Sequence, residues 1–76
     1  MLFWKKRRAA AELDALIDEM KINLANNYKS LAHDARKKLG ARTEQLWAQG
    51  KLTEKEYKKY SAIYTEYTEK LHGYHH

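Results

Sequence analysis

The stretch "QGKLTEKEY", residues 49–57, divides the chain, because it carries the signals for the end of one helix and the start of another. Its glutamine and glycine are typical of a helix end. Thr53 is expected to cap the next helix, and Glu56 completes a capping box in which each side chain accepts a hydrogen bond from the other residue's backbone N–H. Leu52 and Tyr57 have the spacing of a hydrophobic staple. The sequence therefore predicts a turn between two helices.

The residues after this turn predict a second helix at about residues 53–72. Its large apolar and aromatic side chains alternate steps of three and four, which is the heptad spacing of a coiled coil. This seam consists of Tyr57, Tyr60, Tyr64, Tyr67, Leu71 and Tyr74. We expect a packed core built from tyrosines, and the alternative is a platform on which bases or a peptide stack.

The residues before the turn predict a long first helix at about residues 9–49. Apolar side chains recur every three or four positions and form one stripe. The stripe consists of Leu13, Ile17, Met20, Leu24, Tyr28, Leu31, Ala35, Leu39 and Leu46. Leu16 widens it, whereas Ile22 and Trp47 point to roughly the opposite side and need a second partner surface or stay exposed. The spacing of the apolar residues continues across the asparagines at 26–27, and two polar residues are a short connection between helices. We therefore expect one uninterrupted helix.

Such a helix would be about 60 Å long, roughly twice the length of the second helix, so the seam from Leu13 to Leu24 would be bare. We therefore expect an all-α antiparallel helical hairpin that dimerises into a four-helix arrangement. The alternative is a three-helix bundle with a break near residues 26–27. The expected dimer interface consists of Leu13, Ile17, Met20, Leu24, Tyr28, Leu31, Tyr60, Tyr64 and Tyr67.

Charged residues are arranged in two blocks on either side of the asparagines. Residues 9–20 contain four acidic side chains and no cation, whereas residues 29–42 contain five cations and one aspartate. An antiparallel contact centred on residues 26–27 would place the acidic block beside the basic block, whether the contact forms within one chain or between two chains. The asparagines would then be a hinge, or a polar contact at a two-fold axis.

Composition limits the class of protein. The chain has 76 residues, no cysteine and no proline, and 33% of its residues are charged. These values predict one small helical domain, at residues 9–73, followed by a tail at residues 74–76. The absence of cysteine excludes disulfides and thiolate chemistry and favours a cytoplasmic location.

The first eight residues, "MLFWKKRR", form an apolar and basic N-terminal arm. Lys5, Lys6, Arg7 and Arg8 supply most of the formal net charge of +5, so the rest of the chain is nearly neutral. Four apolar residues cannot span a bilayer, which needs about 20. We expect a terminus that packs locally, and the alternative is a contact with an anionic membrane surface or with nucleic acid.

No residues form a recognisable catalytic or cofactor-binding motif. His33 has no neighbouring nucleophile. The histidines of residues 72–76 have a spacing that could gather a zinc ion on a continuing helix, but Gly73 predicts that the helix ends. We therefore expect no catalytic residue, no metal, no cofactor and no small-molecule substrate.

The stretch "QGKLTEKEYKKY", residues 49–60, resembles the start of the second helix of the short C-terminal domain called SHOCT, a small oligomerisation module. The long helix before this stretch and the tyrosine seam after it depart from the family's pattern. The resemblance implies, at most, that the chain associates.

Together these features predict a non-enzymatic helical module for protein–protein interaction or oligomerisation, with a second copy of the chain as its expected partner. The alternative is a peripheral membrane-surface or nucleic-acid-binding adaptor that uses the cations of the N-terminal arm.

Overall fold

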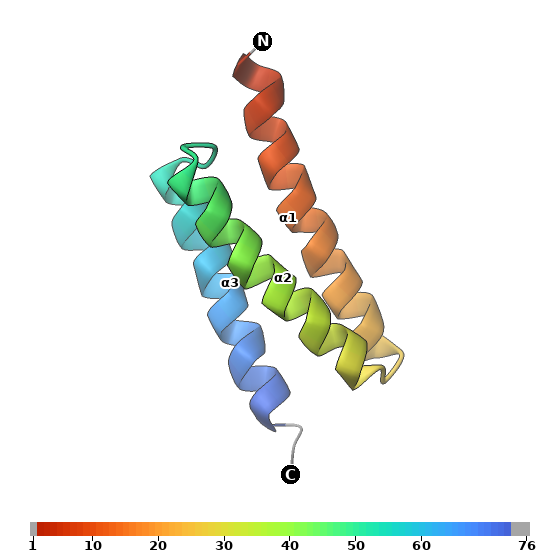
Figure 1. Cartoon of the computed structure of the whole chain (residues 1–76). Helices are drawn as coiled ribbons and strands as arrows, with labels where there is room; N and C mark the ends of the chain where they lie inside the picture. The colour runs from red at the N-terminus through yellow and green to blue at the C-terminus, as the bar shows by residue number, and fades with distance from the viewer. Residues whose placement is uncertain (1, 74–76) are drawn as a thin grey trace.

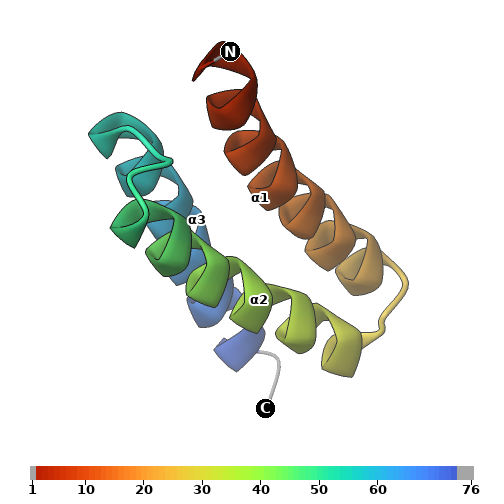
Figure 2. The ribbon, with the colours of Figure 1, turned by 45° about the horizontal axis from the view of Figure 1, so that its top comes forward.

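The chain reverses direction twice between three helices (Figures 1 and 2). The computed structural model describes residues 2–73, and side chains for residues 8–72. The helices are α1 (Leu2–Ala25), α2 (Lys29–Ala48) and α3 (Glu54–Gly73). α2 packs against both neighbours, whereas α1 and α3 touch each other far less. The result is an elongated bundle of 46 × 18 × 15 Å in which α2 is the central helix. All regular elements in residues 2–73 are helices, which confirms the all-α prediction.

The prediction of one uninterrupted helix over residues 9–49 was wrong. α1 ends at Ala25 and α2 begins at Lys29, so the alternative, a three-helix bundle with a break near residues 26–27, is confirmed. The reversal lays α2 along α1, and Leu13, Ile17 and Met20 of the seam that a straight helix would leave bare are buried. The second predicted helix is confirmed, because α3 spans nearly the expected residues.

The structure describes the predicted N-terminal arm and C-terminal tail only in part. The backbone of residues 2–8 is helical and forms the first part of α1. Arg8 is exposed, whereas the side chains of Lys5, Lys6 and Arg7 lie outside the described residues. The tail at residues 74–76 lies outside them as well.

Asn27 makes the first reversal possible. It has a φ of 66°, in the left-handed region that asparagine tolerates better than most residues. The N–H of Asn27 donates to the carbonyl of Leu24 at 3.0 Å, and the N–H of Tyr28 donates to the carbonyl of Asn23 at 2.7 Å. These two hydrogen bonds are those of a Schellman motif, a common helix end in which glycine usually holds the left-handed position. The asparagine pair is therefore a helix stop.

Substituting Asn27 tests this assignment. We expect Asn27→Ala to lower the free energy of unfolding by about 1 kcal/mol, because alanine is strained at positive φ, and Asn27→Gly to raise it by about 0.5 kcal/mol. Chemical denaturation followed by circular dichroism measures both. Asn26→Ala is the matched control, since positive φ among the non-glycine residues described is confined to Asn27. Equal effects at the two positions would contradict the assignment.

The second turn has the predicted capping chemistry. The N–H of Thr53 donates to Oε1 of Glu56 at 2.8 Å, and the N–H of Glu56 donates to Oγ1 of Thr53 at 3.1 Å, which confirms the capping box. Gly50 has a φ of 72°. The N–H of Lys51 donates to the carbonyl of Leu46 at 2.9 Å, so α2 also ends in a Schellman motif.

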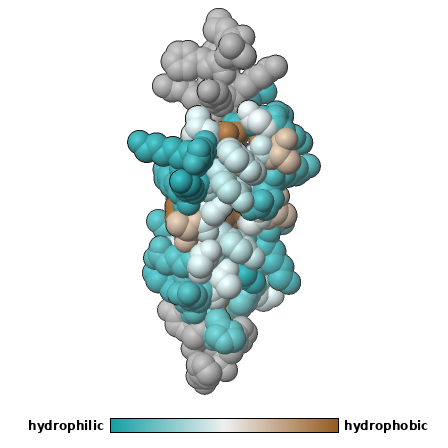
Figure 3. Space-filling model, turned by 90° about the vertical axis from the view of Figure 1, so that its left-hand side faces the viewer, coloured by the Kyte–Doolittle hydropathy of each residue, from teal (hydrophilic) through white to brown (hydrophobic). Residues whose placement is uncertain are grey.

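The core lies along the inner faces of all three helices. Its buried apolar residues are Ala9, Leu13, Ile17, Met20, Ala32, Ala35, Leu39, Leu46, Leu52, Tyr60 and Leu71. The described part of one face of the molecule is mostly teal and white in Figure 3, with only small brown patches, because the apolar side chains point inward. Thr43 is also buried, and its hydroxyl donates to the carbonyl of Leu39 at 2.7 Å, so the core leaves no orphaned donor there.

The tyrosines of α3 belong largely to this core, as predicted for Tyr60, which is 2% exposed. Its hydroxyl donates to Oδ1 of Asp14 at 2.8 Å and so links α3 to α1. Burial, together with the neighbouring carboxylate, raises the pKa of the Tyr60 phenol. Tyr64 and Tyr67 are half-buried, and Tyr74 lies outside the described residues.

Within residues 2–73, no helix combines the length and the apolar character that a membrane span requires.

Candidate functional site

A groove with a volume of about 830 Å³ lies between α1 and α2. No residue of α3 lines it. Its apolar lining consists of Ala15, Leu16, Ile22, Leu31 and Ala35, and its polar lining consists of Glu12, Asp18, Glu19, Asn23, Asp34, Lys38 and Arg42. α3 packs mainly against α2 and lines no part of the groove, so this side of the α1–α2 pair has no third helix over it.

Two large apolar side chains of the groove face solvent. Ile22 is 59% exposed and Leu31 is 52% exposed. Leu16 lies deeper, half-buried against the core. Exposed apolar residues are common one at a time, and here two of them line the same hollow.

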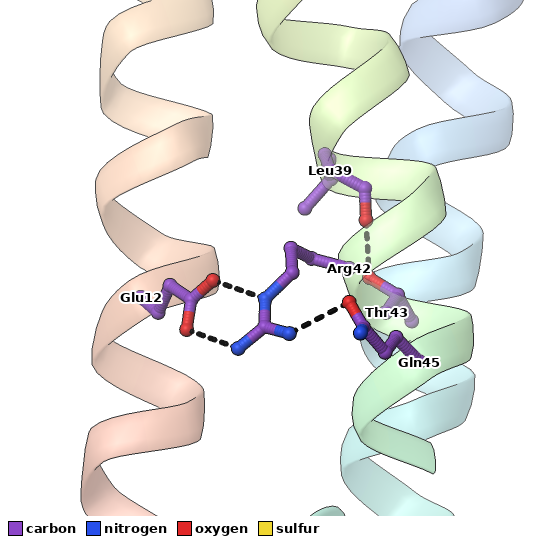
Figure 4. A network of polar contacts seen from close by, with 5 residues as sticks. All are labelled: Glu12, Leu39, Arg42, Thr43 and Gln45. Carbon is purple, nitrogen blue, oxygen red and sulfur yellow. Dashed lines mark hydrogen bonds and ion pairs between the residues drawn. The ribbon is translucent and has the colours of Figure 1, made fainter. Parts of the chain in front are cut away.

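An ion pair bridges the two walls at the end of the groove far from the α1–α2 turn (Figure 4). Nε of Arg42 donates to Oε2 of Glu12, and Nη2 donates to Oε1 at 2.9 Å. Nη1 of Arg42 also donates to Oε1 of Gln45 at 2.7 Å, which holds the guanidinium in place. The hydrogen bonds and charge of Arg42 lower the pKa of the Glu12 carboxyl. This pair joins one residue of the acidic block to one residue of the basic block within a single chain.

The lowered pKa of Glu12 predicts a contribution to acid sensitivity. A carboxylate with a lowered folded-state pKa stabilises the fold above its unfolded value of about 4.3, and this stabilisation is lost as the pH falls through the folded value. Because both side chains are about one-third exposed or more, we expect Glu12→Gln to remove less than about 1 kcal/mol at pH 7 and to flatten the loss of stability below about pH 4. Urea denaturation across pH measures this.

The control for this experiment is Glu66→Gln, because Glu66 forms an exposed pair with Lys70 on a single helix. If both variants keep the acid dependence of the original chain, the Glu12–Arg42 pair does not contribute to it.

The fold places the residues predicted for a dimer interface in different environments. Leu13, Ile17, Met20 and Tyr60 are buried within the chain's own core, and Leu24, Tyr64 and Tyr67 are half-buried against it. Tyr28 and Leu31 are exposed, but only Leu31 lines the groove. The structure therefore does not bring the predicted interface together on one surface.

Two residues that the apolar stripe did not contain take part in the groove. Leu16 widens the stripe and Ile22 lies off it, and the prediction that Ile22 needs a second surface or stays exposed is confirmed. Trp47, the other residue off the stripe, finds a partner within the chain. Its ring stacks on Tyr57 with centroids 4.5 Å apart.

The histidines form no metal site in the described structure. His33 and His72 line a small hollow together with Arg36, Thr68 and Glu69. Among the described residues, no group of three histidine, cysteine or acidic side chains has a geometry that could hold a metal ion.

Comparison with known proteins does not assign the chain to a family. No protein-family model matches it, and neither does any curated protein or solved structure. The class that fold and groove define is that of a small three-helix bundle with an open groove.

Proposed function

We propose that this chain is a non-enzymatic interaction module that receives one helix of a partner protein in the groove between α1 and α2. The observation that carries the proposal is the exposure of Ile22 and Leu31 within one groove whose walls are two helices. Amphipathic helices commonly bind such grooves through apolar side chains spaced three or four residues apart.

The dimensions of the groove support this occupant. Its lining residues run from Glu12 to Asn23 on α1 and from Leu31 to Arg42 on α2. At 1.5 Å per residue, each wall is about 18 Å long, which matches about three turns of the partner's helix. A helix there would complete a four-helix arrangement and would bury the exposed parts of Ile22 and Leu31.

The fold disfavours self-association through the interface expected from sequence. The predicted dimer depended on a bare seam, and Leu13, Ile17 and Met20 of that seam are buried in the chain's own core. The groove is a surface that a second copy could use instead.

Methyl NMR tests the proposal with designed amphipathic helices of about 18 residues, or five turns, that share one leucine face. We expect the methyl signals of Leu16, Ile22 and Leu31 to shift when such a helix is added. The double variant Ile22→Gln with Leu31→Gln should fold, because both side chains are more than half exposed, and should lose the binding. Tyr28→Gln is the control, since Tyr28 is 57% exposed outside the groove.

Sedimentation of the chain alone, at micromolar and millimolar concentration, measures self-association in parallel. A monomer at all concentrations, with no helix that shifts the groove methyls, would refute the proposed function.

A second candidate function uses the N-terminal end of α1. α1 extends past the ends of α2 and α3 (Figure 1), so the basic residues 5–8 belong to a helical projection. Such a projection suits an adaptor for an anionic membrane surface or nucleic acid. Salt-dependent binding to anionic vesicles and to RNA, lost on deletion of residues 1–8, would support it. Equal, negligible binding by both chains would refute it.

A further inference from the structure

We infer that the helix bound by the groove is cationic, with lysine or arginine on both sides of its apolar face. This inference rests on the proposed function and names the chemistry of the partner. It follows from a difference in charge between the groove and the rest of the chain.

The groove is acidic although the chain is basic. The formal net charge of the chain is +5, yet the groove contains four carboxylates and only two cations. Arg42 is already paired with Glu12 across the groove. The groove then has three further carboxylates, those of Asp18, Glu19 and Asp34, and one further cation, Lys38. None of these four side chains takes part in an ion pair with another described residue.

The unpaired carboxylates lie beside the exposed apolar residues. α1 and α2 are antiparallel, and Glu12 is level with Arg42. Moving along both helices toward the turn, Asp18 and Glu19 on α1 come level with the region of Ala35 on α2, next to Asp34. Carboxylates therefore border both sides of the groove near Ile22 and Leu31, where a partner's apolar face would lie.

The same charges disfavour a second copy as the occupant. Two grooves placed face to face would bring two sets of unpaired carboxylates together, with one Lys38 from each copy to offset them. A helix bordered by lysine or arginine instead places a cation opposite each carboxylate. Exposed ion pairs of this kind contribute little individually, and three together are expected to strengthen binding about tenfold.

Three designed helices with the same leucine face test the inference. They carry lysine, glutamine or glutamate beside that face, and their affinities are measured by the methyl shifts of Leu16, Ile22 and Leu31. We expect the lysine helix to bind about tenfold more tightly than the glutamine helix and the glutamate helix to bind most weakly, with differences that shrink as salt is added.

The outcomes separate the inference from the proposed function. Equal affinities, or tighter binding of the glutamate helix, would overturn the cationic partner and leave the groove as a helix-binding site. Concentration-dependent shifts of the same methyls in the chain alone, without a preference for lysine, would identify a second copy as the occupant and overturn the inference. No shift under any condition would refute the proposed function itself.

A charge reversal in the groove locates the effect. Glu19→Lys should reduce the preference for the lysine helix from about tenfold to about threefold or less, since one carboxylate becomes a repelling cation. Glu66→Lys is the matched control, because Glu66 is exposed on α3 outside the groove. Circular dichroism checks that both variants fold. An unchanged preference in Glu19→Lys, or an equal loss in both variants, would overturn the inference.

Discussion

Leu13→Ala is expected to destabilise the chain by about 2 to 5 kcal/mol, which approaches the whole stability of a domain this small. Leu13 lies on α1, is fully buried, and is covered only because the chain turns back at Asn27. Removing its isobutyl group loses the transfer free energy of the buried atoms and leaves a cavity that the bundle fills only in part. Urea denaturation followed by circular dichroism measures the change in the free energy of unfolding.

Leu31→Ala is the matched control for Leu13→Ala, because it removes the same atoms from a side chain that is 52% exposed. We expect it to cost less than about 1 kcal/mol. Both measurements are made at two protein concentrations. Equal costs for the two variants, or a cost for Leu13→Ala that depends on concentration, would contradict a fold in which α2 of the same chain covers α1.

Gly40→Ala is expected to couple strongly to Tyr64. A Cβ at position 40 would lie 2.5 Å from Cε1 and 2.9 Å from Cδ1 of the Tyr64 ring, closer than carbon atoms approach without a shift. Glycine therefore permits α3 to lay an aromatic ring on the backbone of α2. The expected steric cost of about 1 to 3 kcal/mol exceeds or cancels the gain of about 1 kcal/mol that alanine has over glycine inside a helix.

The double-mutant cycle with Tyr64→Ala separates these two effects. Once the ring is absent, only the helix propensity is left, so Gly40→Ala should then stabilise the chain by about 1 kcal/mol. The free energies of unfolding of the four proteins give the coupling energy, which we expect to be about 1 to 3 kcal/mol. A coupling near zero would mean that the ring does not pack on Gly40.

The groove could be predicted only in part from the sequence. The position of Ile22 away from the apolar stripe indicated an unsatisfied apolar residue, and the opposed charge blocks indicated the contact that Glu12 and Arg42 make. Neither observation places Ile22 beside Leu31. That requires the register of α1 on α2 and the side of this pair that α3 leaves open.

The sequence by itself determined the helical class, the extent of α3 and the turn before it. Those features depend on interactions among residues a few positions apart, such as the reciprocal hydrogen bonds of Thr53 and Glu56. The reversal at Asn27 was decided by the tertiary structure. The apolar period fits both a straight helix and a reversed one, and asparagine is compatible with either. What separates them is the burial of Leu13, Ile17 and Met20 under α2, which depends on residues far apart in the chain.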